Sequence, residues 1–317
     1  MNGETVFMFS GQGSQYFHMG RALYEHNETF RDWMLRLDAV ALRASGTSIV
    51  GTLYSDARTR GESFDRLRDS HPAIFMVEYA LAQTLIEAGV RPDMVLGVSM
   101  GSFAAAAVAG YLEAEDALTA VIRQAAALEK RSERGGMIAI LADPALFAGD
   151  LFRGRCELAG VNFSSHFVVS AKPAALTEIE AGLRHDNVSY QRLPVAFPFH
   201  SQWIDDAKGT FDAFMQSIPR TKGTLPMVCC DRTTVQSDVS GDYFWDVVRH
   251  PIRFRETAAR LEQEGPRRYI DVGPAGTLAT FLKYGLPATT KSTVQSILTP
   301  FGFDQKNLAA VLAATGH

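Results

Sequence analysis

A serine flanked by glycines is the sharpest chemical feature of the sequence. Ser99 lies in the segment Gly-Val-Ser-Met-Gly at residues 97–101. The short apolar run 94–98 predicts a β-strand, and the small residues 103–109 predict a helix. A tight turn between a strand and a helix exposes the serine hydroxyl, as in a nucleophile elbow. The pattern indicates nucleophilic catalysis by Ser99, and the alternative is a serine that only caps the helix.

A catalytic serine needs a base to remove its proton, so a histidine from elsewhere in the chain is required. Eight histidines are present. His200 is singled out because residues 195–201 form an apolar, proline-containing junction between two parts of the chain, where ligand sites commonly lie. A hydrogen-bonded structural role is the alternative for this histidine. Four others are expected near helix ends or on polar surfaces: His18, His26, His71 and His185.

Strands and helices of an α/β protein must position this pair. The chain starts with a predicted strand at residues 5–10, a glycine-rich turn at 11–15 and a helix through 19–26. A longer helix is predicted to begin at His71-Pro72, because proline suits a first helical turn, and to close at Gly89. Its apolar face should pack on a sheet.

Residues 136–195 follow a different order. Their pattern predicts strand 137–141, helix 144–152, strands 156–162 and 167–171, helix 173–183 and strand 189–195. This βαββαβ order indicates a ferredoxin-like insert. Beyond it, the chain predicts helices at 204–218, 253–264 and 277–284 and a strand at 268–272. We therefore expect an α/β fold, with an α/β-hydrolase-like large domain (1–132 and 198–317) built on a parallel sheet and interrupted by a ferredoxin-like α+β subdomain (133–197).

Composition limits the class of protein. Of 317 residues, 46% are hydrophobic and 21% charged, as in a soluble globular protein. A net charge of −4 argues against a nucleic-acid binder. No apolar run approaches the roughly 18 residues of a membrane span, and the start lacks a signal-peptide pattern, so we expect a cytoplasmic protein. The cysteines, Cys156, Cys229 and Cys230, have no metal-ligand spacing, so neither a zinc site nor a disulfide framework is expected.

Four ordered motifs carry a resemblance to a known family. They are Phe-Ser-Gly-Gln-Gly-Ser-Gln at 9–15, the serine motif at 97–101, Phe-His-Ser at 199–201 and Asp-Val-Gly-Pro at 271–274. Together they resemble the malonyl-CoA:acyl-carrier-protein transacylase family over nearly the whole chain. More narrowly, the chain is similar to the discrete, trans-acting acyltransferases of polyketide synthases.

The resemblance implies a role for each matching residue. Ser99 would form the acyl-enzyme and His200 would relay its proton. Backbone N–H groups of Gln12 and Met100 would hold the oxyanion. In this family a main-chain carbonyl orients the histidine in place of an acid, and that carbonyl maps to His250. No metal or organic cofactor is implied, because the thioester, on phosphopantetheine or coenzyme A, is already activated.

The chain departs from the family pattern at three positions. Val98 replaces the usual histidine before the nucleophile, and Ser102 replaces the usual glutamate. Members that use malonyl groups carry an arginine 25 positions after the nucleophile, where this chain has Gln124. An arginine there would bind the malonyl carboxylate through a bidentate pair, which glutamine cannot form. Arg123 is one position away and should face elsewhere, because adjacent helical residues point about 100° apart.

These departures predict the substrate. A buried carboxylate without a cationic partner is costly, so we expect an acyl group that has no free carboxylate. The acyl pocket is expected to include Gln124, Phe199 and Val98. The favoured interpretation is an enzyme that takes acyl chains from an acyl carrier protein and passes them to water, as in the acyl hydrolases that clear stalled polyketide chains.

Three alternatives stay open at this point. The acyl-enzyme could deliver its acyl group to another carrier protein, or Arg123 could support malonyl loading. A non-catalytic module that only binds carrier proteins is the remote alternative. The expected partner is an acidic carrier protein, with no nucleic acid or membrane, and the enzyme is expected to be a monomer. Candidate docking residues, which are otherwise ordinary surface charges, are Arg153, Arg155, Arg249 and Arg253.

Overall fold

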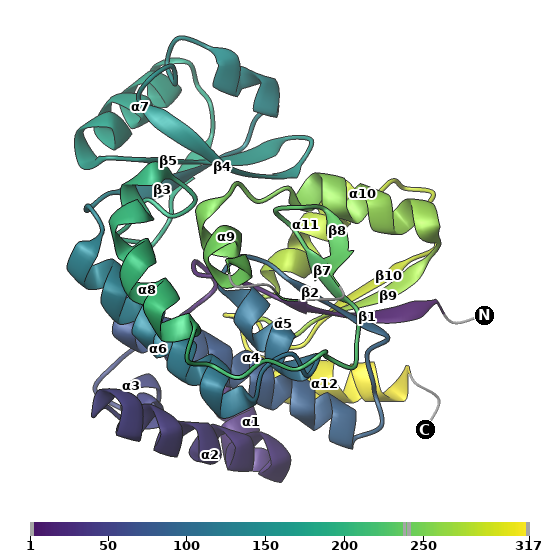
Figure 1. Cartoon of the computed structure of the whole chain (residues 1–317). Helices are drawn as coiled ribbons and strands as arrows, with labels where there is room; N and C mark the ends of the chain where they lie inside the picture. The colour runs from purple at the N-terminus through teal and green to yellow at the C-terminus, as the bar shows by residue number, and fades with distance from the viewer. Residues whose placement is uncertain (1–2, 237–238, 240–241, 315–317) are drawn as a thin grey trace.

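The computed structural model describes residues 3–236, 239 and 242–314. Its centre is a six-stranded sheet in the order β10-β9-β1-β2-β7-β8 (Figure 1). Strands β10, β9, β1, β2 and β7 pair in parallel, and β8 pairs with β7 in antiparallel fashion. The strands are β1 Glu4–Phe9, β2 Met94–Gly97, β7 Met227–Cys229, β8 Thr234–Gln236, β9 Arg267–Asp271 and β10 Thr293–Ser296.

Both faces of this sheet are covered by helices, as a parallel sheet requires. In β1, the side chains of Phe7 and Phe9 pack into the larger apolar cluster, which also contains residues of α2, α4, α5 and α6. Val6 and Met8 point to the opposite face, into a cluster with residues of α10 and α11. These helices are α2 Glu28–Ser45, α4 Leu67–Glu87, α5 Gly101–Val108, α6 Ala114–Arg131, α10 Phe254–Glu264 and α11 Thr277–Gly285.

Shorter elements complete the layer around the large sheet. They are α1 Arg21–His26, α3 Ile49–Leu53, the 3-10 helix η2 Gln202–Ala207, α8 Lys208–Met215, α9 Tyr243–Arg249 and α12 Asp304–Ala313. None of the helices in the described part of the chain combines the length and apolar character needed to cross a bilayer.

A second, four-stranded sheet lies at the upper left of Figure 1, above α9 and to the left of α10. Its order is β4-β5-β3-β6, and the paired strands are antiparallel. One face packs on α7 around a separate apolar cluster that includes Ile138, Phe167 and Leu183. The elements are β3 Gly136–Ile140, the 3-10 helix η1 Pro144–Ala148, β4 Cys156–Phe163, β5 His166–Ala171, α7 Pro173–His185 and β6 Tyr190–Arg192.

The α/β class predicted from the sequence is confirmed, but several elements differ from their predicted extent. The helix predicted at 144–152 is only the short 3-10 helix η1, which ends before Gly149. The strand predicted at 189–195 stops at Arg192, because Pro194 has no N–H to continue a ladder. The helix predicted at 204–218 is divided into η2 and α8. The hydrolase-like and ferredoxin-like descriptions and the boundary at 132/133 stay predictions.

The start of α4 is the largest local difference. The helix begins at Leu67, so His71 and Pro72 lie inside it rather than at its first turn. Pro72 has no N–H to donate to the carbonyl four residues earlier, which removes one bond from the helical ladder. Burial of the surrounding helix compensates, since every residue of α4 from Ser70 to Ala82 is buried.

Candidate active site

Ser99 lies in a strained turn between β2 and α5. Its backbone φ of 54° is in the left-handed region, which residues other than glycine rarely adopt. Glycine is needed on both sides, because a Cβ on Gly97 would lie 2.4 Å from the Cα of Ser102, and one on Gly101 would lie 2.3 Å from the carbonyl oxygen of Phe9. The turn therefore has the strand-turn-helix geometry predicted for a nucleophile elbow.

His200 meets Ser99 from a distant part of the chain. Its Nε2 lies 2.9 Å from Ser99 Oγ, and its Nδ1 lies 2.6 Å from the carbonyl oxygen of His250. Because a carbonyl only accepts, Nδ1 must carry the proton and Nε2 must accept from the serine hydroxyl. The backbone N–H of His200 donates to the carbonyl of Val248 at 3.0 Å. This arrangement directs the unprotonated nitrogen of His200 at the hydroxyl of Ser99.

Burial controls the charge of His200. The residue is 2% exposed. Desolvation lowers its pKa to about 4, although the His250 carbonyl and the negative charge of Asp231 act in the opposite direction. His200 is consequently neutral near pH 7, which is the form that can accept a proton from Ser99.

A glycine-rich loop passes directly over the serine. A Cβ on Gly11 would lie 3.0 Å from Ser99 Cβ, so the loop backbone approaches the turn closely. Gln12, the next residue, and Met100, the residue after the serine, both line the cavity at Ser99. Their backbone N–H groups are the predicted oxyanion donors, and that assignment stays a prediction.

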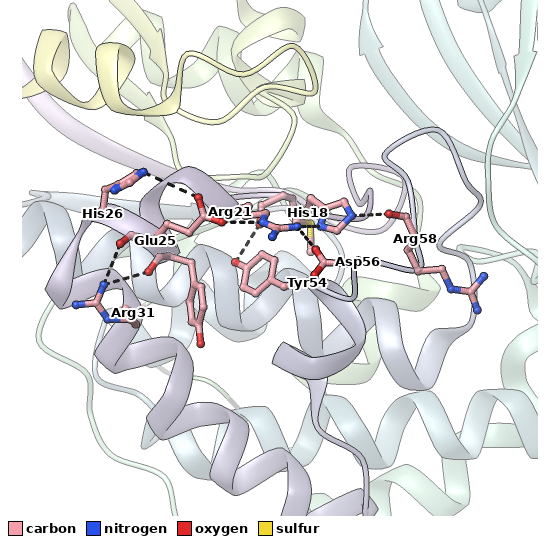
Figure 2. Close-up of polar contacts among 10 residues, drawn as sticks. His18, Arg21, Glu25, His26, Arg31, Tyr54, Asp56 and Arg58 are labelled. Atoms are coloured by element: carbon pink, nitrogen blue, oxygen red, sulfur yellow. Dashed lines mark hydrogen bonds and ion pairs between the residues drawn. The ribbon is translucent and has the colours of Figure 1, made fainter.

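Both ends of this loop are anchored. At its start, the backbone N–H and the hydroxyl of Ser10 donate to Glu78 Oε1 on α4, at 2.7 and 2.9 Å. Burial raises the pKa of the Glu78 carboxyl well above its usual value. Three residues after the glycine-rich turn at 11–15, His18 Nε2 lies 2.7 Å from the Arg58 carbonyl oxygen, and Arg21 contacts both His18 and Asp56, as Figure 2 shows. The loop is therefore held against the serine by contacts that are distant in sequence.

A cavity of about 340 Å³ opens at Ser99 between the two sheets. Val98 and Phe199, two of the predicted pocket residues, line it. None of the described residues that line the cavity is an aspartate, glutamate, lysine or arginine. Its apolar lining comes from both parts of the chain: Val98, Met100, Met137, Ala139, Val168, Leu193, Pro194, Phe199, Val248, Ile252, Leu278 and Phe281.

Gln124 lies elsewhere than predicted. It is fully buried on α6 but does not line the cavity. Its Nε2 donates to the Phe244 carbonyl at 3.4 Å, so the short amide is turned toward α9 instead of the serine. Arg123, by contrast, is exposed and its guanidinium lies 5.9 Å from the ring of Phe214. The prediction that Arg123 faces away from Gln124 is confirmed.

Two cavity residues were missed from the sequence. His71, expected near a helix end or a polar surface, is 1% exposed on α4 and lines the cavity. His166 also lines it, with Nδ1 3.0 Å from the side-chain nitrogen of Asn162. The sequence did contain a pattern that could have indicated a buried His71. This residue directly precedes an apolar run in which Glu78 is the single charged residue. Polar residues in such a run are expected to have a specific partner.

The candidate docking residues are all engaged in ion pairs. Arg153 contacts Asp150 at 3.0 Å, and Arg155 contacts Glu178 at 3.1 Å. Arg249 lies between Asp205 and Glu157, and Arg253 pairs with Glu256. Their charges are balanced locally, so none of the four is a free cation for an acidic partner.

One group of side chains that could bind a metal includes His250, the residue whose carbonyl contacts His200. Oxygen and nitrogen atoms of Asp231, Asp246 and His250 lie within 4.8 Å of one another. Arg232 donates to Asp246 at 2.7 Å, and His250 Nδ1 lies 3.3 Å from Asp231. Arg232 therefore already pairs with both carboxylates, at 2.7 Å from Asp246 and 3.9 Å from Asp231. The expectation that the protein needs no metal stays a prediction.

Fold and site together define a class: an α/β protein in which a serine on a strained strand-helix turn contacts a buried, neutral histidine. Residues 6–316 match the acyl transferase domain family, and the chain belongs to that family.

Relatives of similar length support the same assignment. The polyketide biosynthesis acyltransferase homolog BaeD of Bacillus velezensis is 44% identical over 98% of this chain and 96% of its own length. The homolog PksD of Bacillus subtilis is 42% identical with the same coverage. Among solved structures, the acyltransferase domain of the second module of the salinomycin polyketide synthase has a TM-score of 0.88 at 28% identity, and covers 99% of this chain and 74% of that one.

Proposed function

We propose that the protein is a serine-dependent acyl transfer enzyme. Ser99 Oγ attacks the carbonyl carbon of an acyl thioester while His200 Nε2 takes the hydroxyl proton. The resulting oxyanion is held by the backbone N–H groups of Gln12 and Met100. The intermediate then collapses, the carbon–sulfur bond breaks, and the proton passes from His200 to the leaving thiolate. The observation that carries this proposal is the continuous contact from Ser99 through His200 to the His250 carbonyl.

We infer that the acyl group carries no free carboxylate. The cavity at Ser99 is lined without a formally charged side chain among the described residues. Burial of an unpaired carboxylate in such a site costs several kcal/mol. The sequence supports the inference separately: the position where malonyl-using relatives carry an arginine holds the uncharged Gln124, and neither Gln124 nor Arg123 lines the cavity.

The favoured acceptor is water. In this version His200 Nε2 takes a proton from a water molecule, which attacks the carbonyl carbon of the acyl-enzyme ester. The bond from that carbon to Ser99 Oγ then breaks, and His200 returns the proton to Ser99 Oγ, which releases the free acid. The substrate is an acyl chain on an acyl carrier protein of a polyketide pathway, in keeping with the names of BaeD and PksD. Transfer to a second carrier protein is the alternative, and it uses the same acyl-enzyme.

We also propose the remaining features expected from the sequence. These are a hydrolase-like large domain, a ferredoxin-like subdomain, a monomeric state and a cytoplasmic location.

The test is intact-mass spectrometry of the enzyme after brief exposure to different thioesters. Malonyl-CoA, acetyl-carrier protein and a longer acyl-carrier protein are compared, and the decay of each adduct in buffer is followed. Rapid labelling by uncharged acyl groups, with fast loss to water, is the expected result. An adduct that discharges only to a second carrier protein would favour the transferase. Efficient malonyl labelling would contradict the substrate proposal.

A further inference from the structure

A second buried histidine contacts the loop that is proposed to hold the oxyanion. His71 Nε2 lies 3.1 Å from the side-chain oxygen of Gln12, and both residues line the cavity at Ser99. We propose that His71 is a positioning residue: by holding the Gln12 side chain, it fixes the direction of the Gln12 backbone N–H toward the oxyanion. This inference rests on the proposed function, because it gives His71 a role only in acyl transfer.

The protonation state of His71 suits this task. The side-chain oxygen of Gln12 only accepts, so His71 Nε2 must carry the proton of the neutral ring. Desolvation lowers the pKa of His71 to about 3, which keeps the ring neutral near pH 7. Within the described residues, neither His71 Nδ1 nor Gln12 Nε2 has a hydrogen-bond partner. The bond between the two side chains is therefore the contact on which their mutual position depends.

The same helix also holds the start of the loop. Glu78 lies seven residues after His71, which is about two helical turns and places both on one face of α4. Glu78 Oε1 accepts from the backbone N–H and the hydroxyl of Ser10. One face of α4 thus contacts the loop on either side of Gly11, the residue that lies against Ser99. The ring of Phe199, 5.8 Å away, limits the movement of His71.

Loss of this contact should affect the chemical steps rather than substrate binding. An oxyanion donor stabilises the transition state only when it is already in place, and removal of one such donor costs about 10²–10³ in kcat. Formation and decay of the acyl-enzyme pass through oxyanions at the same position. A displaced Gln12 N–H should consequently slow both steps and leave KM almost unchanged.

The experiment compares His71→Ala with His71→Gln on a small acyl thioester of N-acetylcysteamine. Acyl-enzyme formation and decay are measured separately in single-turnover reactions. We expect His71→Ala to reduce both rate constants about 10–100-fold, with KM changed less than about twofold. His71→Gln should recover most of the activity, because its amide N–H can donate to Gln12. Ser70→Ala is the matched control, since Ser70 is buried on the same helix and its hydroxyl bonds to the Arg66 carbonyl.

A double-mutant cycle keeps the test decisive. Gln12→Ala removes the same side-chain bond but leaves the backbone N–H, so His71→Ala should add little to it. If His71→Ala does not fold, Gln12→Ala and His71→Gln give the same test from both sides of the bond. Wild-type rates in His71→Ala, equal losses in the Ala and Gln variants, or a loss confined to KM would overturn the positioning role. Turnover in Ser99→Ala would instead overturn the proposed function itself.

Discussion

His200 Nδ1 lies 2.6 Å from the main-chain carbonyl oxygen of His250. In a Ser-His-Asp triad this place belongs to a carboxylate, whose replacement by an amide costs about 10⁴ in kcat. Here the backbone supplies the acceptor, so the side chain at position 250 is not required for the contact.

This relationship predicts a mild effect for His250→Ala. The side chain is 50% exposed and contacts Asp231 rather than His200. We expect kcat to fall less than about threefold, because alanine keeps the main-chain carbonyl that accepts from His200 Nδ1. His200→Ala, measured in the same steady-state thioesterase assay, should abolish turnover. A loss in His250→Ala as large as that in His200→Ala would show that the imidazole, not the carbonyl, orients the base.

The pH dependence of the reaction should report His200. Only the neutral ring accepts the serine proton, and burial lowers the pKa of His200 to about 4. The value of kcat/KM on a small thioester should therefore stay level from about pH 8 to about pH 5 and fall below that. The charge of Asp231 favours the protonated ring, so Asp231→Asn should lower this pKa and move the acid limb to lower pH. An acid limb near pH 6.5, or one that moves upward in Asp231→Asn, would contradict this account.

Gln124→Arg tests the charge at the position where malonyl-using relatives carry arginine. The residue is completely buried, and its oxygen has no partner among the described residues. A buried cation without a partner should lower the free energy of unfolding by about 3 kcal/mol or more, which thermal unfolding measures. The variant tests whether an arginine, which is longer than glutamine, reaches the cavity at Ser99 from this position. An arginine that does so should let malonyl-CoA partly restore the melting temperature and label the variant better than the wild type. Gln124→Leu, which is similar in volume but uncharged, should show neither effect.

The chemistry of the site was predictable where it depends on local sequence. Gly97 and Gly101 are required beside Ser99 because an added Cβ would lie only 2.4 and 2.3 Å from neighbouring backbone atoms, and such a requirement is visible in the sequence as glycine. Three of the parallel strands, β1, β2 and β9, were predicted from the sequence, whereas the short strands β7 and β10 were not. His200 was recognisable because an apolar junction seldom contains a polar ring without a reason.

What the sequence did not reveal depends on contacts between distant segments. His71 is buried because α4 packs beneath a loop that lies 59 positions earlier. No local pattern encodes that approach, and the neighbouring Pro72 favours a helix start that the tertiary packing overrides. Gln124 was placed in the pocket by analogy with a longer side chain, but its amide donates to the Phe244 carbonyl and does not line the cavity.

Peptide-level mass spectrometry of the acylated enzyme tests the central claim most directly. The wild type and Ser99→Ala are exposed to the same uncharged acyl thioester, quenched in acid and digested, and circular dichroism confirms that the variant is folded. We predict one acyl group on the peptide that contains Ser99 in the wild type and none in Ser99→Ala, which should also lose turnover. An acyl adduct that persists in Ser99→Ala, or one located on a cysteine-containing peptide, would contradict the assignment of Ser99 as the nucleophile.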